Sequence, residues 1–398
     1  METFFAVTSP GLEELAAQEL RRLGLLPKEL PARRPSRVRR YSSAHYDHSH
    51  LPGEDSGGVA FEGELADLYR ANLHLRTASR VLVRLGEFNA TGFAELRKKA
   101  GRLAWGRYMA PGQPVDLRVT CHKSRLYHSD AVAERVAGAI GDCLGRPALL
   151  QKQDEEQAGQ PPQLVVVRLV NDTCAISVDS SGSLLHRRGY RLATAKAPLR
   201  ETLAAAMLLA AGWDAASPLL DPFCGSGSIA IEAALLARGL PPGRSRRFAF
   251  MDWPGYDRKL WEAIRAEVQT RPANELPPIQ ASDRDAGAIE MARANAERAG
   301  VAEFIEFSCQ AVSAIQPPEG PGWVVTNPPY GLRVSANRDL RNLYAQLGHV
   351  LKAHCMGWHV AILCNDPKLL SQTGLRLDTS FSMVNGGVKV RLARGRVA

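Results

Sequence analysis

The stretch that most constrains this fold is a glycine-rich turn between an apolar strand and an apolar helix. Residues 217–220 predict the end of a short buried strand, and residues 229–237 are apolar at helical spacing. Between them, Gly225 and Gly227 allow a tight turn whose bare amides can lie against a ligand. Asp221 ends the strand, where open α/β sheets bind their ligands. Alone, such a short motif also fits an ordinary tight turn.

A second strand end later in the chain closes in Asn327-Pro328-Pro329-Tyr330, after the apolar run 323–326. The prolines fix φ and stiffen the turn, and Tyr330 offers an aromatic face for stacking a base. The Asn327 side-chain oxygen and the Pro328 carbonyl could accept the two hydrogens of an exocyclic amine, so that its lone pair points at an electrophile. This use of Tyr330 needs its ring and not its hydroxyl. The alternative for the whole segment 327–330 is a proline-rich turn with a purely structural role.

Together the two turns resemble motifs I and IV of class I S-adenosylmethionine-dependent methyltransferases that modify exocyclic or amide nitrogens. The resemblance implies S-adenosylmethionine as the cofactor, with its methionine part against the glycine-rich turn. It also implies that Asn327 borders the cofactor as well as the amine. The cofactor-binding residues implied in the first turn are Asp221, Pro222, Phe223, Cys224, Gly225 and Gly227.

The next predicted strand, residues 279–282, ends at Asp283. A carboxylate there can accept charge-assisted hydrogen bonds from both hydroxyls of a ribose. The alternative role, capping the following helix, suits Asp285 better. One position departs from the family pattern. The acid that usually receives the adenine corresponds here to Ala311, so Gln310 or backbone groups would hold the adenine.

Length and composition limit the wider architecture. A chain of 398 residues predicts two or three domains, and a net charge of +9 suits a polyanionic partner such as RNA. The seven cysteines are scattered without a Cys-x-x-Cys pair, which favours reduced thiols in a cytoplasmic protein and argues against zinc sites and disulfides. No apolar run reaches the roughly 18 residues of a membrane span, and no basic leader follows Met1. We therefore expect a cytoplasmic protein with no metal and no membrane association.

The first half of the chain alternates strands and helices in an order typical of α+β modules. Thr8 or Ser9 should cap a helix over residues 11–23, and Ser129 or Asp130 one over residues 129–144. Strands 165–170 and 173–178 flank Asn171-Asp172 and predict a hairpin. Residues 31–58 predict a loop whose arginines could contact RNA or simply be solvated. Its histidines, a weak metal signal, are His45, His48 and His50.

The second half alternates strands with helices, which predicts a doubly wound, mostly parallel sheet. A hairpin across Asn385-Gly386-Gly387 supplies an antiparallel edge. A helix is expected over residues 260–271. Before it lies a loop whose arginines could contact RNA or be solvated: Arg244, Arg246 and Arg247.

Further segments are similar to the THUMP-domain family of RNA guanine-N2 methyltransferases, closest to the RlmL-type 23S rRNA enzymes. They are residues 4–15, 123–125, 177–191, 197–205 and 250–257. The resemblance implies an α/β Rossmann-like methyltransferase domain over residues 183–398. It is preceded by a ferredoxin-like domain over residues 1–64, which carries the insert at 31–58, and by a THUMP RNA-binding domain over residues 65–182.

The resemblance implies methyl transfer to the N2 amine of a guanosine in structured RNA, with 23S rRNA favoured over tRNA and no obligate protein partner. The catalytic residues would be Asn327, Pro328 and Tyr330. The alternatives are methylation of adenine N6 or of a glutamine amide, and a non-catalytic RNA-binding assembly factor supported only by Ala311. Methylation of carbon through a cysteine nucleophile is disfavoured, because the second turn contains no cysteine.

Overall fold

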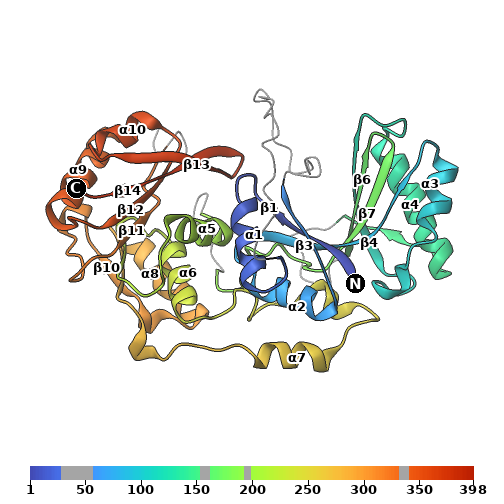
Figure 1. The fold of residues 1–398 in the computed structure, drawn as a ribbon, viewed down its shortest axis with the longest axis horizontal. Coiled ribbons are helices and arrows are strands. Elements are labelled where there is room, and N and C mark those ends of the chain that lie inside the picture. The colour runs from blue at the N-terminus through green and yellow to red at the C-terminus, as the bar shows by residue number, and fades with distance from the viewer. Residues whose placement is uncertain (28–56, 153–161, 192–198, 331–339) are drawn as a thin grey trace.

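The computed structural model describes residues 1–27, 57–152, 162–191, 199–330 and 340–398 of the chain. The molecule is elongated and contains two seven-stranded sheets (Figure 1). The C-terminal sheet lies at one end, and the N-terminal sheet extends from the middle of the molecule to the other end. The predicted insert at 31–58 lies outside the described residues except for Gly57 and Gly58, and so do residues 197 and 198 of the family segment 197–205. No helix in the described ranges is both long enough and apolar enough to cross a membrane.

The N-terminal sheet has the strand order β2-β1-β3-β7-β6-β4-β5. Strand β4 runs parallel to β5 and β6, and the other pairs are antiparallel. The strands are β1 Glu2–Thr8, β2 Gly58–Gly63, β3 Ala78–Asn89, β4 Pro114–His122, β5 Leu149–Leu150, β6 Gln163–Val170 and β7 Thr173–Asp179. The helices are α1 Glu13–Arg22, α2 Leu65–His74, α3 Phe93–Ala100 and α4 Ser129–Leu144, with a short 3₁₀ turn η1 Trp105–Arg107.

Strand β3 belongs to both parts of this sheet. It pairs with β1 on one side and with β7 on the other. The boundary proposed between residues 64 and 65 falls between β2 and α2, and the sheet continues across it through β3. The predicted hairpin is confirmed as β6–β7, with positive φ at Asn171 and Asp172.

The predicted side-chain caps of α1 and α4 are wrong. Leu12 and His128 stand at the two N-cap positions, and within the described chain no side chain makes the capping bond there. The carboxylate of Glu13, the first residue of α1, instead accepts hydrogen bonds from the backbone N–H groups of Gly11 and Gly57, which lie outside the helix. The cap predicted at Asp285 is confirmed, since its carboxylate accepts from Gly287 N and Ala288 N.

The C-terminal sheet has the strand order β10-β9-β8-β11-β12-β14-β13. The first five strands are parallel and β14 is antiparallel to both neighbours, which confirms the doubly wound sheet with an antiparallel edge. The strands are β8 Leu219–Asp221, β9 Ile279–Asp283, β10 Glu306–Cys309, β11 Trp323–Thr326, β12 His359–Cys364, β13 Leu377–Asn385 and β14 Val388–Arg396.

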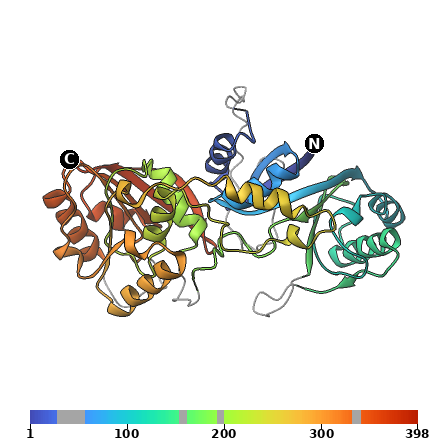
Figure 2. The ribbon, with the colours of Figure 1, turned by 90° about the horizontal axis from the view of Figure 1, so that it is seen from below.

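Helices flank these strands. They are α5 Glu201–Ala211, α6 Ser228–Ala237, α8 Ala286–Ala299, α9 Arg341–His354 and α10 Pro367–Gln372, whereas α7 Arg258–Ala266 packs against α2 of the N-terminal half. The 3₁₀ turns are η2 Ala249–Asp252, η3 Ala273–Glu275, η4 Ala302–Phe304 and η5 Val312–Ala314. Helix α7 is shorter than the predicted span 260–271. Seen from below, it lies across the middle of the molecule (Figure 2), and it contacts α2 of the N-terminal half.

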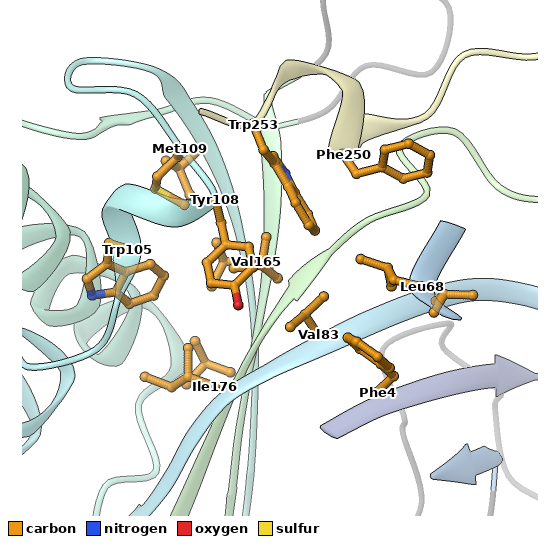
Figure 3. Packing of buried hydrophobic residues seen from close by; sticks show 14 of the residues in the cluster. Phe4, Leu68, Val83, Trp105, Tyr108, Met109, Val165, Ile176, Phe250 and Trp253 are labelled. Atoms are coloured by element: carbon orange, nitrogen blue, oxygen red, sulfur yellow. The ribbon is translucent and has the colours of Figure 1, made fainter. Parts of the chain in front are cut away.

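The two halves complete each other's cores. Phe250, from the C-terminal half, stacks on Tyr69 of α2 with ring centroids 4.4 Å apart. Trp253 meets Tyr108 edge-on, and its indole N–H donates to Gln163 Oε1 at 2.8 Å (Figure 3). In the other direction, Leu12 and Leu15, at the start of α1, are buried in the core of the C-terminal half. The halves are therefore interlocked rather than merely tethered.

Candidate active site

The candidate site lies where the order of the parallel strands reverses. Strand β8 is paired with β9 on one side and with β11 on the other, so the carboxyl ends of these three strands meet at one sheet edge. Asp221 ends β8, Asp283 ends β9, and Asn327 follows β11. A reversal of strand order opens a crevice at this edge, which is the usual ligand position in doubly wound sheets.

The glycine-rich turn needs both of its glycines. Gly225 and Gly227 have φ of +51° and +82°, in the left-handed region that favours glycine. A Cβ at Gly227 would lie 3.0 Å from the Cβ of Ala292 on α8, so the turn packs closely against that helix. A Cβ at Gly225 would meet no described atom within 4 Å, so this side of the turn is open. The backbone is thus exposed on one side and fixed on the other.

Asp221 is fully buried beneath this turn. Its Oδ1 accepts from the Thr326 hydroxyl at 2.6 Å and from the backbone N–H of Phe223 at 3.3 Å. Its Oδ2 is buried and has no hydrogen-bond partner among the residues that the structure describes. Burial raises the pKa of the Asp221 carboxyl to about 7, and the nearby Asp283 contributes in the same direction.

Asp283 joins the turn to the following helix. Its Oδ2 accepts from the Gly225 N–H at 3.1 Å, and its Oδ1 accepts from the Asp285 N–H at 3.1 Å. Each carboxylate oxygen has further acceptor capacity after one such bond, which suits a pair of vicinal hydroxyls. The Gln310 N–H donates to the Asp283 carbonyl at 3.0 Å, which places the end of β10 beside this acid. Ala311 follows and is exposed.

The Asn-Pro-Pro-Tyr turn presents a second orphaned acceptor. Asn327 Oδ1 is buried and lacks a hydrogen-bond partner in the described part of the chain. Buried polar atoms are almost always paired, so the two unpaired acceptors of Asn327 and Asp221 favour a ligand that brings N–H groups or positive charge. The residues therefore fit a cationic, amine-bearing cofactor and an amine substrate.

Two residues that the sequence did not single out contact this turn. The fully buried Tyr344 of α9 has its hydroxyl 3.4 Å from the Pro329 carbonyl, to which it donates, and 3.3 Å from Cys364 Sγ. The Asn385 amide donates to the Tyr330 hydroxyl at 3.1 Å. In sequence, Tyr344 is typical of a core position on a helix and Asn385 of a hairpin turn. Neither pattern carries a functional signal.

Cys224, which the resemblance placed in the cofactor-binding turn, is buried. Burial, with Asp221 and Asp283 close by, raises the pKa of its thiol. A buried thiol of raised pKa is a poor nucleophile, which agrees with the view that this site does not methylate carbon through a cysteine.

Among the three arginines before η2, Arg246 lies at the joint between the halves, and the other two bond within the catalytic half. Arg246 donates to the carbonyls of Leu184 and Ser181, and burial lowers its pKa to about 9. Arg244 donates to the Ala299 carbonyl. Arg247 is largely exposed and pairs with Asp252. Two of these three arginines, for which the sequence left both RNA contact and solvation open, are thus engaged with backbone carbonyls.

The described residues contain no cluster of three or more side chains able to hold a metal ion. The three histidines that gave the weak metal signal, His45, His48 and His50, lie outside them.

Two family models match this chain. The one described as "RMKL-like, methyltransferase domain" matches residues 188–394, and the one described as "RlmL ferredoxin-like domain" matches residues 52–82. A protein of Synechocystis sp., named "Putative RNA methyltransferase slr0064", is 34% identical over 396 residues, which cover 98% of this chain and 96% of that protein.

Solved structures agree with these matches. The crystal structure of SMU.472, "a putative methyltransferase complexed with SAH", has a TM-score of 0.82 and 28% identity, over 99% of this chain and 97% of that one. The structure of "a predicted N6-adenine-specific DNA methylase" from Listeria monocytogenes has a TM-score of 0.80 and 30% identity, over 98% and 95%. Both cover nearly the whole chain, so the likeness includes the N-terminal half.

Proposed function

This chain belongs to the RMKL-like methyltransferase family, and from that premise we propose that it methylates the exocyclic N2 amine of a guanosine in structured RNA, 23S rRNA in the first place. It is an S-adenosylmethionine-dependent methyltransferase. The RNA substrate is supported by the Synechocystis relative, by the RlmL-like N-terminal match and by the net charge of +9.

S-adenosylmethionine supplies a methyl group made electrophilic by its sulfonium. In our proposal the residues Asp221 to Gly227 hold its methionine part, because Asp221 Oδ2 is an unpaired acceptor there and the Gly225 side of the turn is open. Asp283 holds the ribose through the remaining lone pairs of its two oxygens. Gln310 and the backbone beside Ala311 hold the adenine, since no acid stands at the end of β10.

The observation that carries the proposed chemistry is the buried, unpaired Oδ1 of Asn327. With the Pro328 carbonyl it accepts the two hydrogens of the target amine, so that the nitrogen lone pair faces the methyl group. Bound S-adenosylmethionine would supply the methyl group to this nitrogen and leave as the thioether, and the methylated nitrogen would lose one proton to solvent. The Tyr330 ring stacks on the base. Rate enhancement comes from position and preorganised polar groups rather than from a strong base.

We further propose that residues 1–64 and 65–182, as ferredoxin-like and THUMP domains, present the RNA. Their strands share one sheet through β3, and a segment of the catalytic half completes their core. The RNA-presenting part is therefore fixed relative to the methyl-transfer turn.

A second candidate is adenine N6. The 30% identical Listeria structure carries that description for DNA, and the turn accepts any exocyclic amine of suitable position. We favour guanine because the resemblance to RlmL-type enzymes extends over most of the chain.

The test is nucleoside mass spectrometry on total RNA from a strain that lacks the gene, before and after incubation with the purified protein and cofactor. We expect N2-methylguanosine to be missing at one position and to be restored. Restored N6-methyladenosine would identify the second candidate, and methylated ribose or carbon would contradict the mechanism. Cofactor binding without any product would point to an assembly factor.

A further inference from the structure

The hairpin at the antiparallel edge of the catalytic sheet reaches back to the methyl-transfer turn. Asn385 ends β13, and its partner across the hairpin is Val388. The Asn385 Nδ2 donates to the hydroxyl of Tyr330 at 3.1 Å. Both residues are partly buried, so solvent competes only in part for this bond. The bond joins the chain's last hairpin to the residue that ends the Asn-Pro-Pro-Tyr turn.

Strand β13 is itself held by the N-terminal half. Gly11, in the turn before α1, has φ of +94°, and a Cβ at this position would collide with the Ser382 carbonyl oxygen. The next residue of β13, Met383, is buried in the same core cluster as Leu12. The N-terminal half therefore packs on β13 three residues before Asn385.

The hydrogen bond from Asn385 restricts how the Tyr330 ring can rotate. The ring packs at the margin of two hydrophobic clusters of the catalytic half, and its rotation about the side-chain torsions sets the plane on which a base would stack. The hydroxyl is the side-chain atom farthest from the backbone, so a hydrogen bond to it restricts the orientation of the ring most effectively. The Tyr330 hydroxyl, which stacking on a base does not itself require, thus accepts a hydrogen bond from Asn385.

We propose that Asn385 is a positioning residue for methyl transfer. It fixes the Tyr330 ring through the hydroxyl and so links the substrate-base platform to the hairpin on which the N-terminal half rests. This role rests on the proposed function, because it assumes that Tyr330 stacks on the target base.

The test is a double-mutant cycle in the full chain, with Asn385→Ala, Tyr330→Phe and both together, measured as single-turnover methylation at saturating cofactor. Each single variant removes the same bond, so each should slow the step by about three- to tenfold, the scale for one neutral hydrogen bond. The double variant should be no slower than the slower single variant. Cofactor affinity by calorimetry and the melting temperature should remain at the wild-type values.

Two further variants sharpen the cycle. Asn385→Asp can accept a hydrogen bond from the Tyr330 hydroxyl, so its rate should recover with Tyr330 present but not in the Tyr330→Phe background. Asn274→Ala, at an exposed asparagine of the same half, is the matched control and should leave the rate unchanged. Additive losses, or a wild-type rate for Asn385→Ala, would overturn the positioning role.

The hydrogen bond between Asn385 and Tyr330 can also be tested by NMR without RNA. In protein labelled with ¹³C-tyrosine, the Tyr330 signal is the one lost in Tyr330→Phe, and it should shift in Asn385→Ala but not in Asn274→Ala. An unmoved signal would show that the bond is absent. If the wild-type protein methylated no RNA, the proposed function and the positioning role would both fall. If it methylated a different base, only the guanine assignment would fall and the cycle could still be measured.

Discussion

At the scale of single residues, Asp221 stands out because burial raises its pKa to about 7. In the unfolded chain this carboxyl keeps its proton only below about pH 4, whereas in the folded protein it keeps the proton up to about pH 7. The folded state therefore binds more protons over this interval. The contribution of Asp221 to the free energy of unfolding falls as the pH rises from about 4 to about 7, and is constant above that.

This titration should appear in cofactor binding. A cationic cofactor beside Asp221 favours the ionised carboxylate, so binding below about pH 7 releases a proton. We expect S-adenosylmethionine affinity to rise up to about tenfold per pH unit below pH 7 and to level off above it. Asp221→Asn should flatten the profile, and Asp130→Asn, at an exposed position of α4, should not. Calorimetry at several pH values measures the affinity of the wild type and of both variants. A wild-type affinity that does not change with pH would show that Asp221 does not contact the cofactor.

Asp283 should matter for the cofactor more than for the fold. Asp283→Ala removes a charged acceptor from the ribose and should weaken S-adenosylmethionine binding by about 1.5–3 kcal/mol. The matched variant is Asp285→Ala, two residues on, which uncaps α8. It should lower the free energy of unfolding by about 1 kcal/mol and change affinity much less. Titration calorimetry and denaturant unfolding on both variants distinguish the two roles; equal effects on affinity would remove Asp283 from the ribose site.

Asn327 should matter for the methylation rate more than for cofactor affinity. Asn327→Ala removes one preorganised acceptor of the target amine and should slow single-turnover methylation by roughly 10²–10³-fold. Cofactor affinity should stay close to that of the wild type, because the ribose and adenine contacts lie on β9 and β10. A fully active variant would sink the assignment of this turn to the amine.

At the scale of elements, apolar periodicity was enough to predict the parallel strands and the β6–β7 hairpin. The helix caps predicted at Thr8, Ser9, Ser129 and Asp130 were wrong, because the helices begin one to several residues away from the positions that the local pattern indicated, with Leu12 and His128 at the N-caps. Those residues of the candidate site that stand at or just after strand ends could be predicted from the sequence. Tyr344 and Asn385 could not, because their contacts with residues 329 and 330 are long-range.

The segment that includes η2 and α7 was the least predictable element. The sequence placed this segment within the methyltransferase domain at 183–398, yet its aromatic residues fill the N-terminal core. Phe250→Ala should lower the free energy of unfolding by about 3–5 kcal/mol, because a fully buried ring stacked on Tyr69 is lost. Exposed Tyr127→Ala is the control and should change it little. Denaturant unfolding gives both values, and equal stabilities would show that the segment does not complete the core.

At the scale of the whole molecule, the turn at Gly11 is where the N-terminal half meets the catalytic hairpin. Gly11→Ala combines left-handed backbone strain with a collision at the Ser382 carbonyl, and should destabilise the protein by more than about 1 kcal/mol and slow methylation by displacing β13. Gly24→Ala is the matched control. It has a similar φ of +75°, but its added Cβ would meet no described atom within 4 Å. It should therefore lower stability without lowering the rate, and a slowed Gly24→Ala would argue against transmission through β13.

The shared core has a consequence for how the chain is made. Residues 1–182 leave the ribosome first, but the rings that close their core, from Phe248 to Trp261, are translated only later. Domains generally fold as units during synthesis, N-terminal first. Here the N-terminal part would instead wait with an open apolar face while residues 183–261, about a fifth of the protein, are translated, and Leu12 and Leu15 would wait for the catalytic core. Nascent chains of this protein should accordingly depend on a holding chaperone until the segment around α7 has emerged.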